Sequence, residues 1–76
     1  MINLSSSSEG KQFIVVNFSG GFLSQKRLYD LGVLKNEKIS IIKNDRFGPI
    51  IIRVKGANIV IGRGLSKKIF IEESNE

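Results

Sequence analysis

The segment closest to a ligand-binding motif in this sequence is GRGLSKK, residues 62–68. Two glycines followed by serine and lysine suggest the loop that wraps nucleotide phosphates. That loop needs four residues between its first glycine and a Gly-Lys-Ser/Thr triplet, and it must follow a strand and begin a helix. The segment meets neither condition. We interpret it as a short turn with loop glycines at the end of a strand.

The acidic residues do not suggest a catalytic or metal site. The sequence has neither histidine nor cysteine, which excludes disulfides, thiolate zinc sites and imidazole catalysis by these residues. Asp30 and Asp45 could serve as a general acid and base, but neither has a carboxylate neighbour in sequence, and Asp45 follows Asn44 in a typical turn. We therefore expect no catalytic residue, no metal ligand and no cofactor.

The positive charge admits several classes of partner. Twelve Lys and Arg against seven Asp and Glu give a net charge of +5, spread along the whole chain. This spread favours a solvated basic surface over a nucleic-acid interface, and an acidic protein or an anionic membrane surface would suit the charge equally well. The five phenylalanines could stack on nucleic-acid bases, but most of them are better explained as core residues. Phe22 and Phe47 lie in expected loops, so the base-stacking interpretation stays open for these two.

The first half of the chain predicts one strand and one helix. Residues 1–9 are serine-rich and polar apart from a few apolar side chains, so we expect a flexible N-terminal segment. Residues 11–18, KQFIVVNF, are rich in β-branched and aromatic residues at both parities, which predicts a strand covered on both faces. No basic start with an apolar run and no stretch of ~20 apolar residues is present, so we expect a cytoplasmic protein.

Residues 24–33, SQKRLYDLGV, carry helix signals at both ends. Ser24 can cap the first amides, Leu23 can pack on Leu28 as a hydrophobic staple, and Gly32 can adopt the left-handed conformation that ends the helix. The sequence therefore predicts a helix of about two turns.

The two faces of this helix differ in character. Leu28 and Leu31 lie three residues apart and predict a face that covers the sheet, whereas Lys26, Arg27 and Tyr29 are expected on the free face. Because so short a helix is unstable alone, packing must hold it.

Three short β-patterned runs follow, at residues 38–43, 50–55 and 58–63. Gly56-Ala57 is a two-residue loop with glycine first, which predicts a type II′ hairpin. In that register Val54 opposes Ile59, and Ile52 opposes both Ile61 and, on the other side, Ile41. All three strands then share one core face.

The opposite face of these strands carries a second apolar group, formed by Ile42, Ile51 and Val60. In the expected register Ile42 opposes Ile51, and charges such as Lys43, Arg53 and Arg63 form the rim. An apolar patch with a charged rim is typical of an interface. The alternative is that the N-terminal segment, or the last strand through Phe70, covers the patch.

Residues 69–71 predict a last short strand, and residues 72–76 an acidic tail. So few residues bury a small core and cannot form two stacked sheets. We expect a single domain, residues 1–76, of the mainly β class: a small, partly open barrel of about five strands with one short helix inserted after the first strand.

Residues 27–73 resemble the ferrous iron transport protein A family, whose pattern places a basic-leucine helix before Leu-Gly, an aliphatic strand, a Gly-Pro-Ile loop, a Val-x-Gly turn and a last strand. The matched positions are Arg27, Leu28, Leu31, Gly32, Ile39, Gly48, Pro49, Ile50, Val54, Gly56, Ile69 and Ile71. The chain departs from the pattern at Lys35-Asn36, where Pro-Gly is usual. The resemblance implies a Src-homology-3-like barrel and a cytoplasmic accessory role beside the membrane GTPase that imports Fe(II), ferrous iron transport protein B.

We therefore expect a non-enzymatic module of ferrous iron uptake that binds and modulates the transporter, in the cytoplasm or peripherally at the inner face of the cell membrane. Expected partners are that transporter and a second copy of the chain, with no nucleic acid and no membrane insertion. The candidate partner-binding residues are Phe22, Lys26, Arg27, Tyr29, Ile42, Ile51 and Val60. The alternative is a nucleic-acid-binding barrel, or a stand-alone relative of the C-terminal domain of iron-dependent transcriptional regulators.

Overall fold

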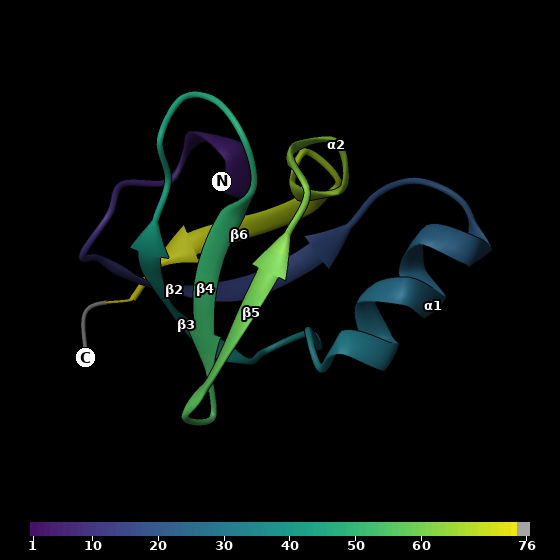
Figure 1. The fold of residues 1–76 in the computed structure, drawn as a ribbon. Coiled ribbons are helices and arrows are strands. Elements are labelled where there is room, and N and C mark those ends of the chain that lie inside the picture. The colour runs from purple at the N-terminus through teal and green to yellow at the C-terminus, as the bar shows by residue number, and fades with distance from the viewer. Residues whose placement is uncertain (75–76) are drawn as a thin grey trace.

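The computed structural model describes residues 1–74 (Figure 1). Within them the chain forms β1 (Ile2–Asn3), a 3₁₀ helix η1 (Leu4–Ser6), β2 (Gln12–Phe18), α1 (Phe22–Leu31), β3 (Lys38–Lys43), β4 (Ile50–Val54), β5 (Ala57–Ile61), α2 (Arg63–Ser66) and β6 (Ile69–Glu73). All the pairings between these strands are antiparallel.

The strands form one sheet in the order β1-β6-β2-β3-β4-β5. Figure 1 shows the sheet curling so that β2 and β6 cross behind β3, β4 and β5. Within residues 1–74, β1 and β5 are its edges, so the barrel is open. The predicted fold class, a mainly β, partly open barrel with a helix after its first long strand, is confirmed. The sixth strand is β1, which the sequence pattern did not indicate.

The core is built from alternate residues of the long strands, because successive side chains on a strand point to opposite faces. The fully or nearly fully buried apolar residues are Leu4, Phe13, Val15, Leu28, Val33, Ile39, Ile41, Ile50, Ile52, Val54, Ile61, Ile69 and Ile71. On β2 the other parity, Ile14 and Val16, is half-buried, so this strand is covered more fully on one face than on the other.

The β4–β5 hairpin corrects one expectation. Its turn is Lys55-Gly56, with φ values of 51° and 81°, and not Gly56-Ala57. Two central residues with positive φ are typical of a type I′ turn, whose twist matches that of the strands. The register consequently differs by two residues from the predicted one: Ile52 pairs with Ile59. Because a shift of two preserves parity, the predicted core face is unchanged.

The β3–β4 pairing agrees with the prediction at one point and departs from it at the next. Ile41 pairs with Ile52 as expected. A bulge then follows, so that Lys43, and not Ile42, lies opposite Ile51. A bulge places one extra residue in a strand and leaves it without a partner.

The two ends of the chain also differ from expectation. In place of a flexible segment in residues 1–9, β1 pairs with β6, and Leu4 is fully buried. The serine-rich composition of this segment does not indicate that its leucine lies buried in the core. The acidic tail expected from residue 72 begins inside β6, which extends to Glu73. Residues 75 and 76 of that tail lie outside the described residues.

Helix α1 begins two residues before the predicted start. Gly21 precedes its first turn without a side-chain cap, so Ser24 is not the cap. Leu23 is exposed and forms no staple with Leu28. The predicted end is confirmed: Gly32 has a φ of 92°, and the Val33 amide donates to the Leu28 carbonyl at 2.9 Å.

Candidate partner-binding surface

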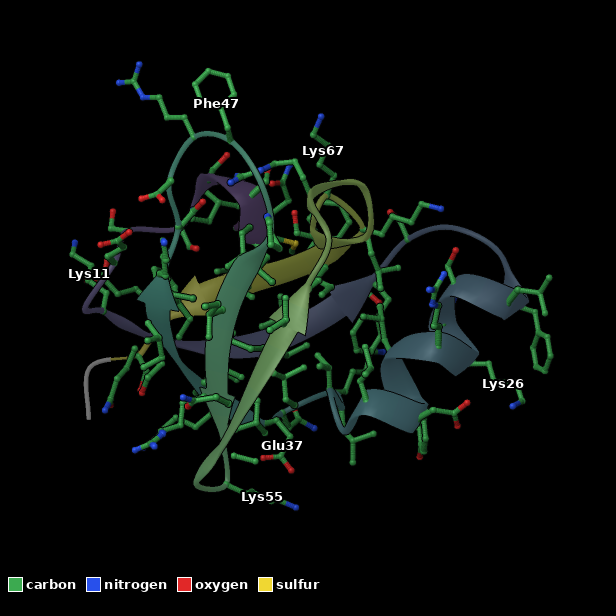
Figure 2. All side chains as sticks on the ribbon, in the orientation of Figure 1. Lys11, Lys26, Glu37, Phe47, Lys55 and Lys67 are labelled. Atoms are coloured by element: carbon green, nitrogen blue, oxygen red, sulfur yellow. The ribbon has the colours of Figure 1, made fainter. Side chains whose placement is uncertain are left out.

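Helix α1 presents two aromatic side chains to solvent. Within Phe22–Leu31 the one buried residue is Leu28, so a single side chain anchors the helix in the apolar core. Phe22 is 77% exposed and Tyr29 is 69% exposed; they lie seven residues apart on the same face, with Lys26 between them. Figure 2 shows Lys26 on the side of α1 that faces away from the barrel. Its ammonium lies 3.3 Å from the carboxylate of Asp30, which keeps this face neutral.

The predicted inner face of the helix holds only in part. Leu31, expected to pack on the barrel beside Leu28, is 39% exposed. Leu23, one turn nearer the start of the helix, is 78% exposed. The helix therefore carries four exposed large apolar side chains, two more than the sequence prediction placed among its candidates. A helix start at Phe22 would have revealed them, because Leu23, Arg27 and Leu31 then fall on one flank.

The outer face of the hairpin sheet holds the other three candidates. Ile51 pairs directly with Val60, a closer approach than the predicted register gave. Val60 is 59% exposed and Ile42, at the bulge, is 46% exposed, whereas Ile51 is half-buried. The N-terminal segment reaches the other edge of the sheet, where β1 pairs with β6. Val60 and Ile42 are thus open to a partner.

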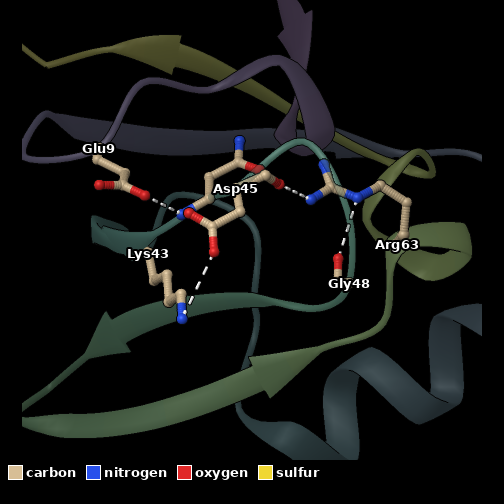
Figure 3. Close-up of polar contacts among 6 residues, drawn as sticks. Glu9, Lys43, Asp45, Gly48 and Arg63 are labelled. Carbon is tan, nitrogen blue, oxygen red and sulfur yellow. Dashed lines mark hydrogen bonds and ion pairs between the residues drawn. The ribbon is translucent and has the colours of Figure 1, made fainter.

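Arg63, expected as a rim charge of this patch, has a different role. Its guanidinium donates to the carbonyl of Gly48 at 3.1 Å and to that of Asp45 (Figure 3). It also donates to the carbonyl of Ser5 at 3.3 Å. The side-chain amide of Asn44 donates to the Ser7 carbonyl at 2.7 Å. These contacts join the β3–β4 loop, η1 and α2 into a unit that we call the polar clasp: Ser5, Ser7, Asn44, Asp45, Gly48 and Arg63.

The helix and the sheet meet at a groove that the sequence did not indicate. A hollow of about 460 Å³ lies between α1 and β5, lined by Arg27, Asp30, Leu31, Val60, Ile61, Gly62 and Leu65. Two candidates predicted on separate elements, Arg27 and Val60, therefore share one groove. Leu65, on α2, is half-buried beneath it. Of the other candidates, Phe22, Lys26 and Tyr29 surround a separate shallow hollow on the outer side of α1.

Phe47 is the other exposed aromatic side chain of note. It stands at the tip of the β3–β4 loop, 87% exposed, in the position that Figure 2 shows.

Within residues 1–74 no three carboxylates gather closely enough to hold a metal ion. In the same part of the chain, none of the helices has the length and the apolar character needed to cross a membrane.

Comparison with known proteins gives a consistent family. The model of the family described as "FeoA domain" matches residues 2–73. A Methanocaldococcus jannaschii protein named "Putative Fe(2+) transport protein A" is 39% identical over 74 residues, which are 97% of this chain and 89% of that protein. The crystal structure of an iron uptake regulatory protein (FeoA) is 32% identical, with a TM-score of 0.91 over 96% of this chain and 97% of the other.

A more distant likeness concerns regulators. A manganese-dependent transcriptional repressor superposes on 95% of this chain with a TM-score of 0.88, at 15% identity, and the match covers 41% of the repressor. At that identity the likeness shows a shared fold alone. The match over residues 2–73 and the 39% identical relative are decisive: the chain belongs to the FeoA family.

Proposed function

We propose that this protein is a non-enzymatic accessory protein of ferrous iron uptake, which binds and modulates the membrane Fe(II) transporter GTPase, ferrous iron transport protein B, from the cytoplasm. Membership of the FeoA family over residues 2–73 is the observation that carries the proposal. The relatives that bear on it are named for Fe(2+) transport and iron uptake.

The surface supports a binding role more than a catalytic one. Exposed apolar side chains gather on α1 and on the outer face of β5, where a protein partner can bury them. Isolated exposed apolar residues are normal, but a group of them on one short helix is typical of an interaction site. Phe22, Lys26, Arg27 and Tyr29 on α1, with Ile42, Ile51 and Val60 on the sheet, are the residues that we propose contact the partner.

The direct test is to measure, by calorimetry, binding to the purified GTP-hydrolysing domain of the transporter from the same organism. We expect a complex that Arg27→Glu weakens, because the reversal places a negative charge on an exposed flank of the helix. Arg46→Glu makes the same charge change in the β3–β4 loop and serves as the matched control.

Two further measurements complete the test. GTP hydrolysis by the transporter domain, measured with and without the protein, shows whether binding changes the rate. A titration with duplex DNA and with RNA at increasing salt examines the regulator-like alternative, in which phosphate-driven affinity falls steeply with salt. Tight, salt-sensitive nucleic-acid binding together with no transporter binding would overturn the proposal.

A further inference from the structure

The groove between α1 and β5 combines three features that point to one kind of ligand. Its first feature is a set of three apolar side chains. Leu31 from the helix, Val60 from the strand and Leu65 from α2 line a hollow of about 460 Å³, within the ~300–1,000 Å³ range of ligand pockets. A second hollow, lined by Leu23, Arg27, Leu65 and Lys68 among others, continues it along the helix. The two hollows share Arg27 and Leu65 in their linings, so they lie next to one another.

The second feature is the free edge of β5. In the described sheet β5 pairs with β4 on one side and ends the strand order on the other. Val54 and Ala57 flank the two-residue turn and form a hydrogen-bonded pair, and such pairs alternate along an antiparallel ladder. Asn58 and Val60 therefore direct their backbone N–H and C=O groups toward the open edge. Among the backbone hydrogen bonds outside helices and strands in residues 1–74, none involves residues 57–61.

The third feature is charge. Arg27 is exposed, and within residues 1–74 its guanidinium has neither a hydrogen bond nor an ion pair. The carboxylate that also lines the groove, Asp30, is already paired with Lys26. Lys68 lines the second hollow, where its ammonium donates to the Ser24 hydroxyl at 3.0 Å. The walls therefore offer an unpaired positive charge beside unpaired backbone groups.

We propose that this groove binds an extended acidic peptide segment, which adds to the free edge of β5 as a further antiparallel or parallel strand. Backbone hydrogen bonds to Asn58 and Val60 hold the segment, one apolar side chain fills the hollow between Leu31 and Val60, and a carboxylate pairs with Arg27. Strand addition to an exposed edge is a common mode of peptide recognition, with specificity set by alternate side chains. The inference rests on the proposed function for the identity of the partner, but the ligand chemistry follows from the groove itself.

A second copy of the chain is the competing occupant, and charge argues against it. Each chain carries a net charge of +5, so two copies repel one another at low salt. An acidic segment gains from the same charges that a second copy must overcome.

The proposal can be tested by titrating the full chain with three short peptides. Changes in the backbone amide chemical shifts, measured by NMR, report the binding. The probe is Ac-Glu-Thr-Glu-Val-Glu-Thr-NH₂; its lysine counterpart has lysine in place of each glutamate; a third peptide carries N-methyl groups on alternate amides of the acidic probe. We expect the acidic probe to shift residues 58–62 and Arg27, and each of the other two to bind roughly tenfold more weakly.

Two variants complete the design. Val60→Pro removes an outward-facing N–H, and proline is tolerated in edge strands at such a position. It should abolish the shifts while the melting midpoint stays close to that of the parent chain. Arg27→Glu leaves the strand untouched and should reverse the preference, so that the lysine peptide binds better than the acidic one.

Four outcomes would overturn the proposal. Three concern the peptides: no shift at millimolar acidic probe, equal binding of the acidic and lysine peptides, or undiminished binding of the N-methylated peptide. The fourth is a set of concentration-dependent shifts in residues 58–62 without any peptide, which would show that a second copy occupies the edge. If any of these appears while the transporter domain still binds, the binding mode is wrong and the proposed function stands. If the peptide binds as expected but the transporter domain does not, the groove binds its ligand and the proposed function is wrong.

Discussion

Two regions of this small barrel are built in opposite ways. In the first, the polar clasp joins the β3–β4 loop, η1 and α2, and Arg63 alone donates to three backbone carbonyls. In the second, α1 is anchored by one buried side chain, Leu28, and leaves four large apolar side chains exposed. The clasp satisfies its polar groups internally. The helix leaves apolar side chains exposed, and the contrast between the two regions is the one expected between a scaffold and a binding surface.

The clasp also explains how an open sheet holds its shape. Because β1 and β5 are both edges in the described sheet, no strand ladder closes the barrel. Arg63, at the start of α2, follows β5, whereas Ser5 follows β1, so their hydrogen bond connects segments next to the two free edges. Side-chain hydrogen bonds thus replace a missing row of backbone bonds.

Leu28→Ala should lower the unfolding free energy most, because it removes the sole buried side chain of α1. Truncating a buried leucine costs about 2–5 kcal/mol of unfolding free energy. We expect a loss in that range by urea denaturation. Leu23→Ala is the matched control on the same helix and should cost about 0.5 kcal/mol or less, since Leu23 is exposed. Equal losses for the two variants would contradict the single-anchor description.

Arg63→Ala should have the next largest effect on stability, and it should act on the polar clasp. Hydrogen bonds from a charged donor contribute about 1.5–3 kcal/mol, and the substitution leaves three carbonyls without this donor. Arg63→Lys should recover little of the loss, because one ammonium cannot reproduce the planar fork of the guanidinium. Urea denaturation provides the measurement, with Arg46→Ala as the control. Full rescue by lysine would show that charge, and not geometry, matters there.

Much of the fold could be predicted from the sequence, because hydrophobic alternation and turn residues specify it locally. The strands at residues 38–43 and 50–54, the core face of β4 and the end of α1 at Gly32 all follow from such local signals. The register of the β4–β5 hairpin, in contrast, could not be predicted correctly. A positive φ at Lys55 is a property of the tertiary context, and the sequence favoured the neighbouring Gly56-Ala57 pair for its glycine.

The candidate site was predicted less completely, for a related reason. Phe22 is a candidate because it lies in an expected loop, and Tyr29 is a candidate because it lies on the expected free face of the helix. The groove needs Arg27 and Val60 to be neighbours, and they lie 33 positions apart in the chain. Leu4 and Arg63 make the same point: the serine-rich start and the apparent rim charge acquire their roles only through contacts distant in sequence.

Ile51→Lys should have a smaller effect on stability than on association. Ile51 is half-buried on the outer face and pairs with Val60, so a lysine there can extend its ammonium into solvent. We expect circular dichroism to be unchanged, the unfolding free energy to fall by about 1 kcal/mol, and binding to the transporter domain to weaken about tenfold. Light scattering gives the oligomeric state in parallel. A loss of stability as large as that of Leu28→Ala would place Ile51 in the core and remove the outer patch from the proposed interface.

Arg27→Glu should change stability least, and so it distinguishes the helix from the polar clasp most sharply. Arg27 is exposed and has no polar contact within residues 1–74, so reversing its charge should alter the unfolding free energy by about 0.5 kcal/mol or less. Its free charge faces the groove, however, so association with an acidic partner should weaken and lose part of its salt dependence. Arg63→Ala should show the reverse pattern, with lower stability and, under conditions where it is folded, near-normal binding. If Arg27→Glu destabilises the fold or binds as the parent chain does, then α1 only covers the barrel. The proposed contrast between a structural clasp and a binding helix would then be wrong.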